Sequence, residues 1–163
     1  MTLRCTKKLL DLLGIRRSDL TDIDPGEDDW YANLLWVERR KCLLLVHAGT
    51  LFPVFVADVR KPELVPLGGW LVRVVESALL EEGLPVDTLG DLNAGEVRVA
   101  KTASRQVLGV MNELAFEAGW HIDHAGGLSY TDLDELNQRL RRSLHTKDGD
   151  YQVPLELVLA RLG

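Results

Sequence analysis

The sequence lacks long hydrophobic runs, and this excludes a membrane-spanning protein. The longest uninterrupted run, residues 42–46, is far shorter than the roughly 18 apolar residues that cross a bilayer. The N-terminus also has neither the apolar centre nor the small-residue cleavage site of a signal peptide. We therefore expect a cytoplasmic protein that makes no membrane contact.

Cysteine is scarce as well. Cys5 and Cys42 are the only two, and they form no CxxC pair, so the sequence indicates neither a metal knuckle nor a thioredoxin-like redox site. We expect both thiols to be reduced and buried.

Positive charge is in deficit. The net charge is −6, which disfavours a dedicated nucleic-acid-binding protein because such proteins usually carry a strong basic excess. Another protein or an anionic ligand is the expected partner, nucleic acid is less favoured, and the sequence leaves the oligomeric state open.

The motifs of common enzyme classes are also absent: the nucleophile elbow, the P-loop, the dinucleotide fingerprint and HExxH. His121 and His124 resemble part of a metal site, but no further cluster has zinc-like spacing, so we expect neither a metal nor a cofactor. His47 and His145 stand alone, and we expect ordinary surface or strand-end histidines.

What is present is typical of one globular domain over residues 1–163, with 46% hydrophobic and 27% charged residues. The patterns predict an α+β fold: an antiparallel, β-meander-centred sheet of four to five strands with four to five helices packed on it. Pro53 indicates an edge strand. The expected strands are 2–5, 32–38, 42–47, 51–57 and 96–101, and the expected helices are 7–13, 67–82, 103–118, 132–143 and 154–162, with Gly119 ending the third helix and Thr102 and Thr131 as caps.

Three segments carry a family resemblance: RCTKKLL at 4–10, DWYANL at 29–34 and KTASRQVLGVMN at 101–112. They occur in this order in a family of bacterial proteins described only as a domain of unknown function, which the chain resembles over about residues 2–145. The resemblance implies a stand-alone bacterial domain and assigns no catalytic residue.

The helix expected at 103–118 contains one unusual stripe. Arg105, Gly109, Asn112 and Phe116 lie along one border of its apolar face. Glycine destabilises a helix interior, so something should approach the backbone at Gly109. One interpretation is a ligand or partner site, with Arg105 as anion anchor and Asn112 as hydrogen-bonding group; the other is that another element of the chain packs there.

The start of the first helix offers a second candidate site. Lys7 and Lys8 lie in its first turn, where the helix dipole favours acidic residues. A bound phosphate or acidic partner would relieve this misfit, and so would pairing of the lysines with the acidic loop at 18–29. Trp30 and Tyr31 form either an aromatic binding surface or a plug at one end of the core.

Two functions follow as hypotheses. The first is a non-catalytic binding or regulatory domain. The second is an enzyme acting on a phosphorylated or nucleic-acid substrate, which requires its basic residues to converge on one pocket with an acid–base group. The basic residues are Arg4, Lys7, Lys8, Lys101 and Arg105, and the possible acid–base groups are Glu113, His121 and Asp123.

Overall fold

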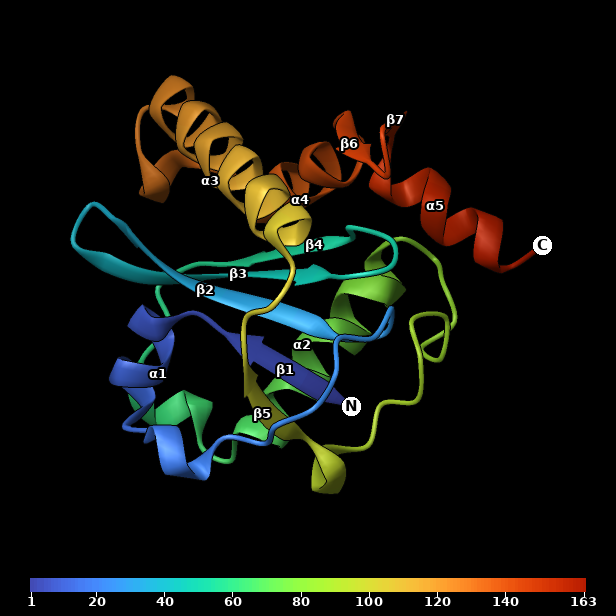
Figure 1. The fold of residues 1–163 in the computed structure, drawn as a ribbon. Helices are drawn as coiled ribbons and strands as arrows, with labels where there is room; N and C mark the ends of the chain where they lie inside the picture. The colour runs from blue at the N-terminus through green and yellow to red at the C-terminus, as the bar shows by residue number, and fades with distance from the viewer.

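The computed structural model describes residues 1–163, and its centre is a five-stranded sheet in the order β4-β3-β2-β1-β5 (Figure 1). The α+β class and the meander of β2, β3 and β4 are confirmed, but the sheet is mixed, because β1 pairs in parallel with both β2 and β5. Crossover connections through helices create these parallel pairs. The strands are β1 (Thr2–Cys5), β2 (Trp30–Val37), β3 (Arg40–His47), β4 (Pro53–Val56) and β5 (Arg98–Lys101).

Helices cover both faces of this sheet (Figure 1). The α-helices are α1 (Lys7–Leu13), α2 (Leu67–Glu81), α3 (Arg105–Ala125), α4 (Leu133–Arg141) and α5 (Pro154–Arg161). A small hairpin, β6 (His145–Lys147) and β7 (Asp150–Gln152), joins α4 to α5. Four 3-10 turns complete the chain: η1 (Arg17–Asp19), η2 (Lys61–Leu64), η3 (Ala94–Glu96) and η4 (Leu128–Tyr130).

Two hydrophobic cores lie on opposite faces of the sheet. The first contains buried residues of α1, α2 and α5, and the second those of α3 and α4. Strand alternation divides β2 between them, since Trp30 and Ala32 belong to the first core and Tyr31 to the second. α1 and α3 therefore pack on opposite faces.

The third helix is longer than expected. Gly119 lies inside α3, which continues to Ala125 and ends at Gly126 with a left-handed φ of 95°. The extension buries Ile122, and this apolar contact favours continuing the helix beyond the glycine. Ser104 caps α3 in place of Thr102, because its side chain accepts a hydrogen bond from the Val107 N–H.

Strand β4 is the edge strand that Pro53 indicated. The Asn137 side chain bonds both backbone groups of Phe55, at 2.7 Å and 2.9 Å, and Arg141 donates to the Pro53 carbonyl. α4, which Asp132 caps in place of Thr131, therefore closes this edge against pairing with another strand.

None of the helices combines the length and apolar character needed to cross a bilayer.

Candidate functional site

The strand directions define one end of the molecule. β1, β2 and β5 are mutually parallel, and β4 has the same direction as β2 because both are antiparallel to β3. The carboxyl ends of β1, β2, β4 and β5 therefore meet at one edge, which we call the carboxyl end of the sheet. In open sheets of this kind, ligands commonly bind outside the carboxyl ends of the strands.

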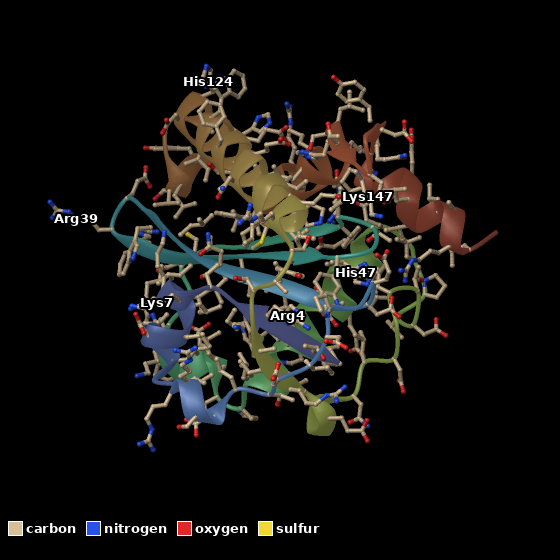
Figure 2. All side chains as sticks on the ribbon, viewed as in Figure 1. Arg4, Lys7, Arg39, His47, His124 and Lys147 are labelled. Atoms are coloured by element: carbon tan, nitrogen blue, oxygen red, sulfur yellow. The ribbon has the colours of Figure 1, made fainter.

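Basic residues gather at this carboxyl end. Seven start β3 or lie within five residues after a strand end, and Lys101 is the last residue of β5. Figure 2 shows Lys7 and Arg39 at this end and His47 at the other. All but the half-buried Lys41 are exposed. Together they form the basic end: Lys7, Lys8, Arg39, Arg40, Lys41, Arg60, Lys61 and Lys101.

Acidic residues are fewer at this end and already have partners in most cases. Asp11 lies 3.5 Å from Lys7, and Asp58 lies 4.0 Å from Arg40. The carboxylate of Glu38 accepts hydrogen bonds from the Leu128 N–H at 3.0 Å and 3.2 Å. The chain as a whole carries −6, so the remainder of the surface is strongly acidic.

The hairpin tip of the basic end is held in a strained conformation. Glu38 and Arg39, which join β2 to β3, have φ angles of 50° and 65°. Both angles suit a type I′ turn, where asparagine and glycine are preferred, so each residue costs roughly 1 kcal/mol here. The bond from the Leu128 N–H to Glu38 fixes the turn against η4, and Arg39 projects away from the molecule (Figure 2).

An exposed aromatic ring borders the basic end. Trp36 is 61% exposed and faces Lys41 across the β2–β3 pair. The Lys41 ammonium lies 5.7 Å from the centroid of the indole ring, within reach of a cation–π interaction. An apolar contact and several cations are thus available to one ligand.

The lysines expected to form a site lie at this end. Lys7 and Lys8 start α1, and Lys101 pairs with Cys5 across β1 and β5. Thr6 stands at the cap position of α1, but its hydroxyl bonds the Asn33 side chain at 2.8 Å and caps no helix N–H. Asn33 therefore connects β2 to the β1–α1 junction.

Arg4 is unavailable to a ligand, because it is 2% exposed and fully engaged within the protein. Its guanidinium donates to the Asp29 carboxylate at 2.6 Å, and also to the carbonyls of Lys101 and Ile23. Asp29 is likewise buried, unlike the rest of the acidic loop, which lies exposed or half-exposed. The Arg4–Asp29 pair joins that loop to β1 and β5.

Trp30 and Tyr31 are also buried, at 0% and 1% exposure, so they form no aromatic binding surface. Their burial agrees with the plug interpretation, but the two rings fill different cores, one on each face of the sheet. The Tyr31 hydroxyl accepts a hydrogen bond from the Ser104 N–H at 3.0 Å and so holds the loop that precedes α3.

Arg105 and Asn112 lie away from the lysines, on the other face of the sheet. The buried face of α3 includes Val110, so its apolar arc is centred opposite the Arg105 stripe and not beside it. Arg105, Gly109, Asn112 and Phe116 are all exposed. No element of the chain packs against Gly109, because a Cβ there would meet nothing within 4 Å. The enzyme hypothesis required the basic residues to converge on one pocket, and they do not.

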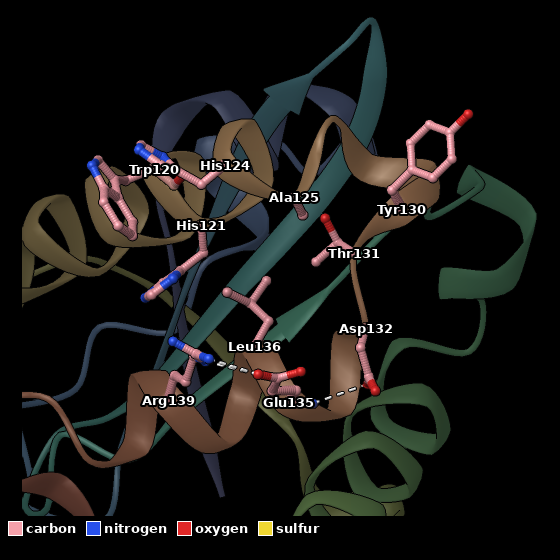
Figure 3. Close-up of a pocket in the computed structure, with 10 residues that line it drawn as sticks. All are labelled: Trp120, His121, His124, Ala125, Tyr130, Thr131, Asp132, Glu135, Leu136 and Arg139. Atoms are coloured by element: carbon pink, nitrogen blue, oxygen red, sulfur yellow. Dashed lines mark hydrogen bonds and ion pairs between the residues drawn. The ribbon is translucent and has the colours of Figure 1, made fainter.

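The histidines of α3 border a hollow between α3 and α4 (Figure 3). His121 and His124 are neighbours on the helix, and the His124 ring stacks on Trp120 with centroids 3.7 Å apart. Glu135, across the hollow, pairs with Arg139 at 2.7 Å. The hollow of about 290 Å³ thus has aromatic and charged walls whose groups already interact with one another.

His47 and His145 lie at strand ends, as expected, but both are buried and not at the surface. Nδ1 of His145 is 2.6 Å from the Glu113 carboxylate, and Nε2 is 2.7 Å from the Ser143 hydroxyl. This order of groups is that of a serine-hydrolase triad. However, the ring is 1% exposed, and the Ser143 hydroxyl lies equally close, at 2.8 Å, to the Leu140 carbonyl. The network joins β6 to α3 and α4.

Sequence reasoning missed Trp36, Arg39, Arg40, Lys41, Arg60 and Lys61. The sequence placed the consecutive charges at 39–41 in a turn between two strands. Whether they lie at the same end of the sheet as Lys7 depends on the strand directions. Only the parallel pairing of β1 with β2 brings the two segments to one end.

Comparison with known proteins gives a family but no described activity. No curated protein matches the chain. A family model described as a domain of unknown function, DUF6933, matches residues 2–157. This span contains the entire five-stranded sheet and the basic end, and the chain therefore belongs to the DUF6933 family.

Proposed function

We propose that this protein is a non-catalytic binding domain that captures an acidic segment of a partner protein at its basic end. The single observation that carries the proposal is the gathering of eight cations at the carboxyl end of one sheet, in a chain whose net charge is −6. Solubility depends on net charge and does not require cations to cluster at one end of the molecule, whereas such a cluster attracts an acidic ligand.

The size of the basic end favours a short acidic segment. Five strands at the usual spacing span about 19 Å, which matches a peptide of several residues. A long nucleic acid would extend beyond the basic end and meet acidic surface, where repulsion opposes binding. Trp36 supplies an apolar contact beside the cations, which suits an acidic peptide that also carries an aromatic or aliphatic side chain.

The free cysteines agree with a cytoplasmic setting, which we also propose. Cys5 and Cys42 are buried and unpaired, and burial raises the pKa of the Cys5 thiol to about 12. A protonated, enclosed thiol is inert toward disulfide exchange.

Fluorescence anisotropy with a labelled acidic peptide containing one tryptophan tests the proposal. We expect saturable binding that weakens as salt rises, because exposed charges are screened. The variant Lys7→Glu/Lys8→Glu should bind roughly tenfold more weakly, from the loss of two attractions and the gain of two repulsions.

The control is Arg98→Glu, a single charge reversal away from the basic end. Arg98 is exposed and starts β5, so it lies at the opposite end of the strand that Lys101 ends. This variant should bind the peptide as the wild type does. Equal loss in both variants would reduce the effect to net charge, and tighter binding of a single-stranded oligonucleotide at the same salt would assign the basic end to nucleic acid.

A further inference from the structure

The outward face of α3 contains residues at alternating spacings of four and three. Arg105, Gly109, Asn112, Phe116, Gly119 and Asp123 follow one another at +4, +3, +4, +3 and +4. This is the spacing of the contact seam between two paired helices. All six are exposed except the half-buried Gly119, and α3 lies on the outside of the molecule (Figure 1). We call these six residues the α3 seam.

The α3 seam has features that the isolated chain does not explain. A Cβ placed at Gly109 or at Gly119 would meet nothing within 4 Å, so neither glycine is required by packing inside the protein. Glycine in a helix interior is destabilising relative to alanine. Between the two glycines, Phe116 is 77% exposed.

The charges of the seam stand at the unfavourable ends of the helix. Arg105 lies in the first turn, where the helix dipole favours anions, and Asp123 lies in the last turn, where it favours cations. Neither forms an ion pair within the chain. The two residues are 18 positions apart, which is five full turns, so they share one angular position about 27 Å apart along the axis.

We propose that a second copy of this chain packs antiparallel on the α3 seam. With a two-fold axis midway between Asn112 and Phe116, Arg105 of each copy lies opposite Asp123 of the other. The same axis sets Gly109 opposite Gly119 of the second copy. Each charge then meets its opposite, and the dipoles of the two helices are antiparallel.

The remaining seam residues fit this arrangement. Glycine opposite glycine lets the two helix backbones approach closely. The two Phe116 rings lie on either side of the two-fold axis, about 6 Å apart along the helix direction, and each shields the other from water. A closed two-fold dimer requires a surface patch that is complementary to a second copy of itself, and the α3 seam meets this requirement.

We expect the dimer to be weak. One helix face buries less than the roughly 1,200 Å² of typical specific interfaces, and most of its apolar area comes from Phe116. Association is therefore expected in the range of tens to hundreds of micromolar. The α3 seam is separate from the basic end, so this inference stands independently of the proposed function.

Sedimentation equilibrium over about 5–500 μM tests the arrangement. The wild-type mass should rise with concentration from 18.2 kDa toward twice that value. Arg105→Asp and Asp123→Arg each place like charges opposite one another and should weaken association at least tenfold. The double variant Arg105→Asp/Asp123→Arg restores both opposite-charge pairs and should recover the dimer.

Arg98→Asp, which changes charge equally but away from the seam, should leave the association unchanged. A wild type that stays monomeric at 500 μM would overturn the inference. So would a dimer that persists in both single variants, or a double variant that stays monomeric although its circular dichroism shows the native fold.

Discussion

The Arg4 guanidinium donates to the Asp29 carboxylate at 2.6 Å, and both side chains are buried. Arg4 also donates to carbonyls of β5 and of the acidic loop, so a single side chain fastens three segments that are distant in sequence. The pair explains how a loop rich in acidic residues lies against the sheet: one of its carboxylates is neutralised inside the protein while the others face water.

Removing Arg4 should therefore destabilise the protein strongly. Arg4→Ala leaves the Asp29 carboxylate buried without a counter-charge and deprives two carbonyls of their donor. We expect the free energy of unfolding to fall by about 3–5 kcal/mol. Urea denaturation followed by circular dichroism measures this change. Arg98→Ala, an exposed arginine on the next strand, should stay within about 0.5 kcal/mol of the wild type; equal stability of the two variants would contradict the structural role of Arg4.

Stability should also depend on pH through His47. Burial, and next the charge of Arg161, lower the pKa of His47 from 6.5 to about 4. Between pH 6.5 and pH 4, His47 is therefore protonated in the unfolded chain but neutral in the folded protein. The contribution of the neutral His47 ring to the free energy of unfolding is complete above pH 6.5. It is lost as the pH falls, by about 2 kcal/mol between pH 7.5 and pH 5.

Urea denaturation at several pH values, compared with His47→Gln, measures this dependence. The substitution should flatten the curve over that range, and an NMR titration should show no protonation of His47 above about pH 5. A His47 ring that titrates near pH 6.5 in the folded protein would refute the explanation.

Several elements of the fold could be predicted because their causes are local. Pro53 cannot donate to a ladder, and it lies on the edge strand. Gly14 takes the left-handed conformation that ends α1, with φ of 68°. The elements whose causes are distant in sequence could not be predicted. The parallel pairing of β1 depends on two crossovers, and Gly119 failed as a stop signal because the buried Ile122 lies beyond it.

The residues of the candidate site likewise fall into those that local sequence predicted and those that required contacts between distant segments. Lys7, Lys8 and Lys101 were identified by local chemistry, whereas their union with Arg39 required the strand directions. Arg4 and Arg105 look alike in the sequence, yet one is buried and the other exposed. Asp29, 25 positions away, accepts the hydrogen bond that allows Arg4 to be buried, and this partner was invisible in a single sequence.

The Ser143–His145–Glu113 network should serve structure and not hydrolysis. Its imidazole is almost completely enclosed, and the Ser143 hydroxyl also lies 2.8 Å from the Leu140 carbonyl, to which it can donate instead of to the ring. A fluorophosphonate probe should leave the folded protein unlabelled. His145→Ala should lower the free energy of unfolding by about 1–3 kcal/mol through lost hydrogen bonds. Labelling that Ser143→Ala abolishes would show a working nucleophile and would contradict this assignment.

The most direct test of the central claim is chemical-shift mapping by NMR with the acidic peptide as titrant. Binding at the basic end predicts shifts in the amides of Lys7 and Lys8, of the hairpin at 39–41 and of residues 60–61, and in the indole N–H of Trp36. The acidic loop at 18–29 and the opposite end of the sheet should remain unchanged. Shifts confined to other surfaces, or no saturable shifts at low salt, would contradict the account.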